Sequence, residues 1–222
     1  MKTTDSAVIE KIVLAGGCFW GTQHLLAQLH GVRRAVAGYA NSEVTNPSYK
    51  EVCTGNTNAA EAVEVEYNAT VVDFSKLLDF FLSSIDPTTK DRQGNDKGTQ
   101  YRSGIYYTTD TQKRLALEAL DRLQKHFNKP IVVEVLPLKN FYPAEEDHQD
   151  YLDKNPGGYC HIPQGLMSEA RHHNILKPEA PTEATHADAN YANEATHLAA
   201  HRQPYSNDAV YPDTKYPNKP GE

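Results

Sequence analysis

Hydrophobic and polar positions follow two different periods along the first two thirds of the chain. Val63, Val65 and Tyr67 alternate with polar residues, as in a strand that is buried on one face. After Asp73, a suitable N-cap, apolar residues from 77 to 85 recur at helical spacing. Because strand and helix patterns occur in the same stretch of chain, we expect a mixed α/β domain.

The same periods predict an ordered series of elements. They are a strand at 12–15, a helix at 20–29, a strand at 32–39, a strand at 63–67, a helix from about 74 to 85, a strand at 105–107, a helix at 110–127, a strand at 131–136 and a short helix at 144–154. The first six follow the order of a ferredoxin-like plait. We therefore expect an α/β (α+β) fold, a two-layer ferredoxin-like plait with additional helices and a long C-terminal coil.

The composition changes after residue 177. Pro, Ala, Thr, Asn and His dominate the remainder of the chain, and large aliphatic residues become rare. Such a segment buries too little apolar surface to fold by itself. We expect a folded domain at 1–177 and a low-complexity tail, extended or disordered, at 178–222.

Charge and hydropathy narrow the classes of partner. The chain has 222 residues and a net charge of -7, and its basic residues are scattered. Nucleic acids and anionic membranes both require a basic face, so neither is an expected partner. The sequence has no run long enough to span a bilayer and no apolar stretch typical of a secretory signal. We expect a cytoplasmic protein whose thiols stay reduced.

The densest chemical pattern surrounds Cys18. Gly16 and Gly17 follow a buried strand and allow a sharp turn, which puts Cys18 at the first turn of a helix. There the helix dipole and free N–H groups favour a thiolate. Phe19 and Trp20 would supply flat apolar walls for a small group such as an S-methyl. Taken alone, a single cysteine in this setting could also be a buried core residue.

Residues 16–21, Gly-Gly-Cys-Phe-Trp-Gly, resemble the active-site signature of the type A peptide methionine sulfoxide reductases. Further blocks of that family follow in the same order, at 46–55 with 61–63, 94–103, 141–149 and 155–160. The resemblance covers roughly residues 8 to 166. It implies a thiol-dependent reductase that converts the S epimer of methionine sulfoxide, free or in proteins, to methionine, without a cofactor. The catalytic domain would then be residues 1–177.

The resemblance assigns a role to each matching position. Cys18 would attack the sulfoxide sulfur as a thiolate. Glu61 would protonate the oxygen, which requires an apolar site that raises the pKa of its carboxyl group. Tyr49 and Tyr101 would donate hydrogen bonds to the same oxygen. Asp96 would help to orient the substrate, and Phe19 and Trp20 would hold the methyl group.

Recycling would need a second thiol. Cys18 would leave the first step as a sulfenic acid, which condenses readily with a nearby thiol. The resemblance makes Cys160 the resolving cysteine, and a dithiol protein such as thioredoxin would reduce the disulfide. Cys53 is interpreted as a structural thiol. The sequence offers no further cysteine after Cys160.

One departure from the family pattern keeps other functions open. Ala59 stands where the family commonly has His, two residues before Glu61. An inactive module that binds methionine sulfoxide peptides is therefore an alternative, as is another thiol enzyme, such as a peroxidase. A metal site is the third alternative, but the 10 histidines are dispersed and no paired-ligand spacing occurs.

Overall fold

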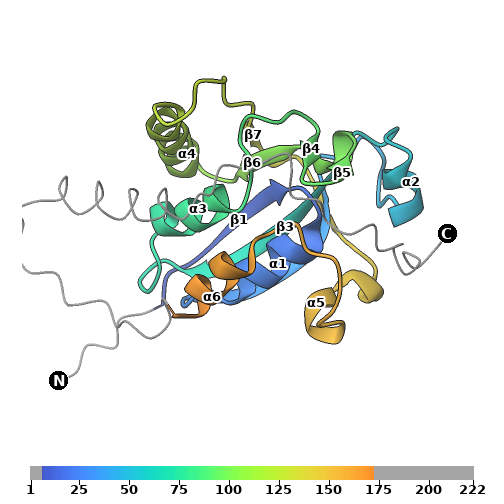
Figure 1. The fold of residues 1–222 in the computed structure, drawn as a ribbon, viewed down its shortest axis with the longest axis horizontal. Coiled ribbons are helices and arrows are strands. Elements are labelled where there is room, and N and C mark those ends of the chain that lie inside the picture. The colour runs from blue at the N-terminus through green and yellow to red at the C-terminus, as the bar shows by residue number, and fades with distance from the viewer. Residues whose placement is uncertain (1–6, 173–222) are drawn as a thin grey trace, which may run out of the picture. The chain divides into compact units, whose positions relative to one another are not determined.

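The computed structural model describes residues 7–172 (Figure 1). The predicted tail at 178–222 lies outside the described residues, so its separation from the folded domain stays a prediction. The elements are β1 (Ile9–Gly16), α1 (Phe19–Ala27), β2 (Val32–Ala40), α2 (Tyr49–Cys53), β3 (Ala60–Asn68), α3 (Phe74–Ser83), β4 (Arg92–Gln93), β5 (Asp96–Lys97), β6 (Ser103–Tyr107), α4 (Asp110–Gln124), β7 (Glu134–Pro137), β8 (Phe141–Pro143), α5 (Tyr151–Lys154) and α6 (Gln164–His172), with 3-10 turns at Thr99–Tyr101 and Glu146–His148.

The main sheet of the described part has the strand order β7-β6-β1-β3-β2-β8. Each of the four inner strands runs antiparallel to its neighbours among them, and β7 lies parallel to β6. Val63, Val65 and Tyr67 on β3 are 0% exposed and share a core with apolar residues of α1 and α3. The alternation in the sequence therefore identified the buried face of this strand, and the mixed α/β class is confirmed.

Two predicted helices begin at identifiable caps. Oδ1 of Asp73 accepts a hydrogen bond from the backbone N–H of Lys76 at 2.9 Å, so Asp73 is the N-cap of α3, as predicted. Thr109 caps α4 in the same way through the N–H of Gln112. No helix between residues 7 and 172 combines the length and the apolar character that a membrane crossing requires.

The ferredoxin-like plait is not confirmed, because the sheet continues past its four inner strands and curls. A flat six-stranded sheet would hold β7 and β8 about 24 Å apart at about 4.8 Å per strand. Only residues 138–140 connect these two edge strands, and so short a segment spans at most about 15 Å. Nδ2 of Asn41, just after β2, also donates to the carbonyl of Pro137 at the end of β7, at 3.2 Å.

Small residues permit this curl on the face away from α1 and α3. A second buried cluster lies there, against which Leu138 and Phe141 pack partly buried. Four of its six members are alanines: Ala15, Ala40, Ala60 and Ala62, together with Val13 and Tyr106. Short side chains let the connection between the edge strands cross this face. A period of two along each strand identifies which residues share a face, but it says nothing about how far the sheet bends.

The predicted helix at 144–154 is wrong as a single element. A 3-10 turn occupies Glu146–His148, the chain is extended at Gln149, and Asp150 adopts a left-handed φ of 51° before α5 begins. The polar amide of Gln149 bonds to strand β2 rather than continuing a helix, as described below. Helices α2 and α6 and strands β4, β5 and β8 were not predicted, because each is short or weakly patterned.

Candidate active site

Most of the predicted site residues lie at one end of the curled sheet. Strands β3 and β6 both run antiparallel to β1, with Leu14 opposite Val63 and Gly16 opposite Ser103. The starts of β3 and β6 therefore lie beside the end of β1, where α1 begins. This register brings Glu61, two residues before Val63, and Tyr101, two residues before Ser103, toward the N-terminus of α1.

Cys18 occupies the N-cap of α1, directly after the turn at Gly17. Gly17 has a φ of +83°, and a Cβ added there would lie 2.5 Å from Cβ of Gln93, so the turn requires glycine. Cys18 is 7% exposed. The sequence predicted a place for Cys18 at the start of this helix, where the positive end of a helix dipole favours an anionic sulfur.

The carboxyl group of Glu61 lies next to the residue that follows Cys18. The backbone N–H of Phe19 donates to Oε2 of Glu61 at 3.2 Å. Glu61 is 1% exposed, and its cross-strand neighbour is the buried Tyr39 of β2. A carboxyl group that is removed from water in this way loses the hydration that favours its charged form, which suits a proton donor.

Tyr49 and Tyr101 converge on the same position from different elements. Burial raises the pKa of both hydroxyls, and their electrostatic interaction with Glu61 raises both further, with a smaller contribution from Cys18. Tyr101 also responds to Tyr49 and Asp96. These electrostatic effects require the groups to lie close together. They also keep both hydroxyls protonated, and therefore able to donate hydrogen bonds, throughout the neutral range.

Asp96 reaches the site from the small two-stranded sheet of β4 and β5. It is 6% exposed and is the register partner of Gln93. Nε2 of Gln93 donates to Oγ of Ser103 at 2.9 Å, which ties this sheet to the start of β6. The long loop between α3 and β6 is thus ordered around the site, as long loops within a compact domain often are when they are functional.

Phe19 and Trp20 belong to an aromatic cluster that the sequence did not reveal in full. Nε1–H of Trp20 donates to Nδ1 of His148 at 3.2 Å, and its ring stacks on Tyr151 at 3.7 Å between centroids. His148 also lies against Phe19 at 5.4 Å and Tyr49 at 4.4 Å. A buried indole N–H needs an acceptor. The sequence therefore indicates that Trp20 has a hydrogen-bond partner, but it does not indicate that the partner is His148.

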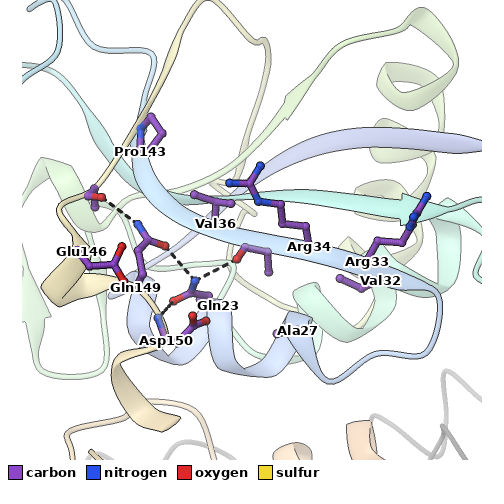
Figure 2. Close-up of a pocket in the computed structure, with 12 residues that line it drawn as sticks. Gln23, Ala27, Val32, Arg33, Arg34, Val36, Pro143, Glu146, Gln149 and Asp150 are labelled. Atoms are coloured by element: carbon purple, nitrogen blue, oxygen red, sulfur yellow. Dashed lines mark hydrogen bonds between the residues drawn. The ribbon is translucent and has the colours of Figure 1, made fainter. Parts of the chain in front are cut away.

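A groove of about 490 Å³ runs along β2 beside α1 (Figure 2). Its floor is a network of glutamine amides: Nε2 of Gln23 donates to the carbonyl of Ala35 at 3.0 Å, and Nε2 of Gln149 donates to the carbonyl of Ala37 at 2.8 Å. Ala37 N–H donates back to Oε1 of Gln149 at 3.0 Å. These bonds hold Gln149 in place, and with it the neighbouring His148 of the aromatic cluster. Cys18, the predicted nucleophile, does not line the groove.

The two remaining cysteines occupy different environments. Cys160 is half-buried, burial raises the pKa of its thiol, and Sγ donates to the carbonyl of Ile162 at 3.6 Å. Its Sγ also lies against α1 at Gly21, three residues after Cys18. Cys53 is exposed at the last residue of α2, where it interacts with Tyr49. The structure therefore brings Cys160, as well as the other predicted residues, to the N-terminus of α1.

The position that departs from the family pattern is apolar and closed. Ala59 is 1% exposed, and its backbone N–H donates to Oγ1 of Thr57 at 3.2 Å. The same core contains Cys18 and Phe19. Within residues 7–172, no group of three or more His, Cys, Asp or Glu side chains could hold a metal ion.

This chain matches known proteins over most of its length. A family model described as peptide methionine sulfoxide reductase matches residues 10–180. The peptide methionine sulfoxide reductase MsrA of Clostridium acetobutylicum is 49% identical over 161 residues, which are 72% of this chain and 99% of the relative. That of Pasteurella multocida is 48% identical over 172 residues, 76% of this chain and 99% of the relative.

Two solved structures are similar over most of the described part. Mxr1 from Saccharomyces cerevisiae in reduced form has a TM-score of 0.66 and 41% identity, covering 71% of this chain and 93% of Mxr1. Methionine sulfoxide reductase A of Corynebacterium diphtheriae has a TM-score of 0.65 and 40% identity, covering 70% of this chain and 79% of its own.

Proposed function

Because this chain belongs to the peptide methionine sulfoxide reductase family, we propose that it reduces the S epimer of methionine sulfoxide, free or in oxidised proteins, to methionine. The observation that carries this proposal is the hydrogen bond from the Phe19 N–H to Glu61, because it holds a buried acid beside the cysteine at the N-terminus of α1. A nucleophile and a proton donor in fixed geometry are what the reaction requires.

In the first step the Cys18 thiolate attacks the sulfoxide sulfur. Glu61 gives a proton to the sulfoxide oxygen, and the hydroxyls of Tyr49 and Tyr101 hydrogen-bond to that oxygen as its charge develops. Methionine leaves, and the oxygen ends on Cys18 as a sulfenic acid. The substrate sulfur is reduced by two electrons, and the sulfur of Cys18 is oxidised by two.

The aromatic cluster and Asp96 serve binding in this scheme. The faces of Phe19 and Trp20 enclose the S-methyl group, since sulfur and methyl groups interact favourably with aromatic rings. His148 and Tyr151 fix the indole of Trp20 by a hydrogen bond and by stacking. Asp96 orients the substrate from the opposite side, through the loop that Gln93 ties to β6.

In the second step the Cys160 thiol condenses with the sulfenic acid and releases water. A dithiol protein such as thioredoxin then reduces the disulfide and restores both thiols. This chemistry suits the reducing cytoplasm, where we place the protein.

Methionine formation from the separated R and S epimers tests the reaction, with dithiothreitol as reductant and Cys18→Ser as the matched inactive protein. We expect turnover of the S epimer only, and none by the variant. Turnover of neither epimer by a correctly folded protein would instead indicate the binding module that Ala59 left open. Consumption of hydrogen peroxide without sulfoxide reduction would indicate a peroxidase.

The resolving role of Cys160 has its own test. Cys160→Ser should form one equivalent of methionine per protein and then stop when thioredoxin is the only reductant. Cys53→Ser, which removes the exposed cysteine, is the control and should recycle normally. If Cys160→Ser recycles with thioredoxin at the wild-type rate, Cys160 is not the resolving residue.

A further inference from the structure

Cys160 is already seated against the first turn of α1, at a residue that has no side chain. A Cβ added at Gly21 would lie 3.0 Å from Sγ of Cys160 and 3.3 Å from Cδ1 of Ile162. Few real Cβ atoms come so close to another atom, so a side chain at residue 21 would require Cys160 or Ile162 to give way by a few tenths of an ångström. Gly21 follows Cys18 by three residues, about one helical turn. The missing side chain therefore gives the second thiol access to the turn that carries the first.

His161 fixes the same segment from its other side. A Cβ added at Gly17 would lie 3.3 Å from Nε2 of His161, and one added at Gly94 would lie 3.1 Å from its Cβ. His161 is 9% exposed. We call Gly17, Gly21 and Gly94 the glycine notch, because residues 160–162 fit where their side chains would be.

The notch holds the thiol before any disulfide exists. The Cys160 thiol donates to the carbonyl of Ile162 at 3.6 Å within the same segment, so its position is set locally as well as by the notch. Gly17 precedes Cys18 in sequence and Gly21 follows it. The space beside Gly17 is bordered by His161, and the space beside Gly21 by Cys160, so both glycines lie next to the same segment. Such an arrangement reduces the chain movement that bond formation between the two sulfurs requires.

We propose that the glycine notch positions Cys160 for disulfide formation, with Gly21 as its principal positioning residue, and that this is why the active-site segment carries glycine at residue 21. The proposal rests on the proposed function. In the step concerned, the Cys160 sulfur attacks the sulfur of the Cys18 sulfenic acid. The S–S bond forms, the S–O bond breaks, and the hydroxide leaves with the thiol proton as water. The sulfenic sulfur gains one electron and the Cys160 sulfur loses one.

Gly21→Ala separates the two steps. The fully reduced full-length protein is mixed with excess methionine S-sulfoxide without reductant, and samples are quenched over time. Chromatography measures the first equivalent of methionine, and mass spectrometry of alkylated samples measures the Cys18–Cys160 disulfide. Gly165→Ala in α6 is the matched control, because a Cβ there meets nothing within 4 Å.

We expect Gly21→Ala to slow disulfide formation at least tenfold more than it slows methionine formation, and Gly165→Ala to change neither rate. Equal slowing of both steps would mean that Gly21 serves the fold of α1, and disulfide formation at the wild-type rate would mean that the notch does not position Cys160. Either result overturns the proposal. Failure of the proposed function is distinguishable, because the wild-type protein itself would then form no methionine or no such disulfide.

Discussion

The backbone N–H of Phe19 donates a hydrogen bond to Oε2 of Glu61 over 3.2 Å, between residues that are 42 apart in sequence. The bond joins the first residue of α1 to the start of β3. Either protonation state of a carboxyl group can accept it. The link can therefore hold Glu61 in place both before and after the side chain gives up its proton.

Replacement of Glu61 by Gln should remove the proton donor while keeping the hydrogen bond to Phe19, because the amide oxygen is also an acceptor. We expect kcat/KM for methionine S-sulfoxide to fall about 10²–10⁴-fold, the usual contribution of a general acid. Steady-state kinetics with dithiothreitol measure it.

Glu64→Gln, on the same strand, provides the control. Glu64 faces Lys11 at 3.5 Å near the surface, and this change should leave the rate within about twofold, since exposed ion pairs contribute little. An equally active Glu61→Gln protein would remove Glu61 from the mechanism.

Tyr49→Phe and Tyr101→Phe should each lower kcat, because each removes one hydroxyl that stabilises the sulfoxide oxygen. We expect losses of about 10–10³-fold for each, near the range for oxyanion-hole donors. Since burial and neighbouring negative charges raise the pKa of both hydroxyls, the rate should show no tyrosine inflection up to about pH 10.

Tyr106→Phe is the matched change for these tyrosines. Tyr106 is also fully buried, but its hydroxyl donates to Glu134 at 3.0 Å, on the outer side of the sheet. Its removal should affect stability and not kcat. A comparable loss of kcat from Tyr106→Phe would show that the effect of the other two variants is not specific.

Stability should decrease in mild acid because of His161. Burial lowers the pKa of this imidazole to about 4, and the nearby Gly16 carbonyl opposes the shift only in part. An unfolded His titrates near 6.5, so between these values the unfolded state binds more protons and acid favours it. The linkage relation predicts a loss of about 2 kcal/mol in the free energy of unfolding from pH 7 to pH 5.

The comparison is urea unfolding of the wild type and His161→Gln at both pH values. The variant should lose about 2 kcal/mol less stability than the wild type over this range, because Gln does not titrate. Carboxylates contribute equally to both proteins and cancel in the difference. Parallel loss of stability in the two proteins would mean that His161 is not the responsible group.

Asp73→Ala should destabilise the protein without affecting catalysis. The side chain caps α3 through the Lys76 N–H at 2.9 Å, and Asp73 is not one of the predicted site residues. Loss of such a cap costs about 1 kcal/mol. Chemical denaturation should show this decrease, and Asp73→Asn should retain most of the stability with kcat unchanged in both. No decrease in Asp73→Ala would contradict the capping role.

The chemical groups could be predicted from sequence to different extents. Cys18 lies between a buried strand with a glycine turn and the start of a helix. This local pattern, together with the family resemblance, identifies Cys18 as the candidate nucleophile. Glu61, Tyr49 and Tyr101 were assigned from the family resemblance alone. His148, which accepts the Trp20 N–H, and His161, which lies against the Gly17 turn, were not assigned any role, because nothing adjacent to them in sequence indicates their partners.

The sequence by itself predicted most of the longer strands and helices and the N-cap of α3, because these depend on neighbours within a few positions. Together with the family resemblance it also assigned Cys18 as the nucleophile. Only the tertiary structure decided that the sheet curls instead of forming a flat plait, that residues 144–154 break into a 3-10 turn and the short helix α5, and that Glu61, Tyr101 and Cys160 come to the N-terminal part of α1. Those outcomes depend on strand register, on the short connection between β7 and β8, and on space left by glycine. All three are contacts between distant segments, which no local period records.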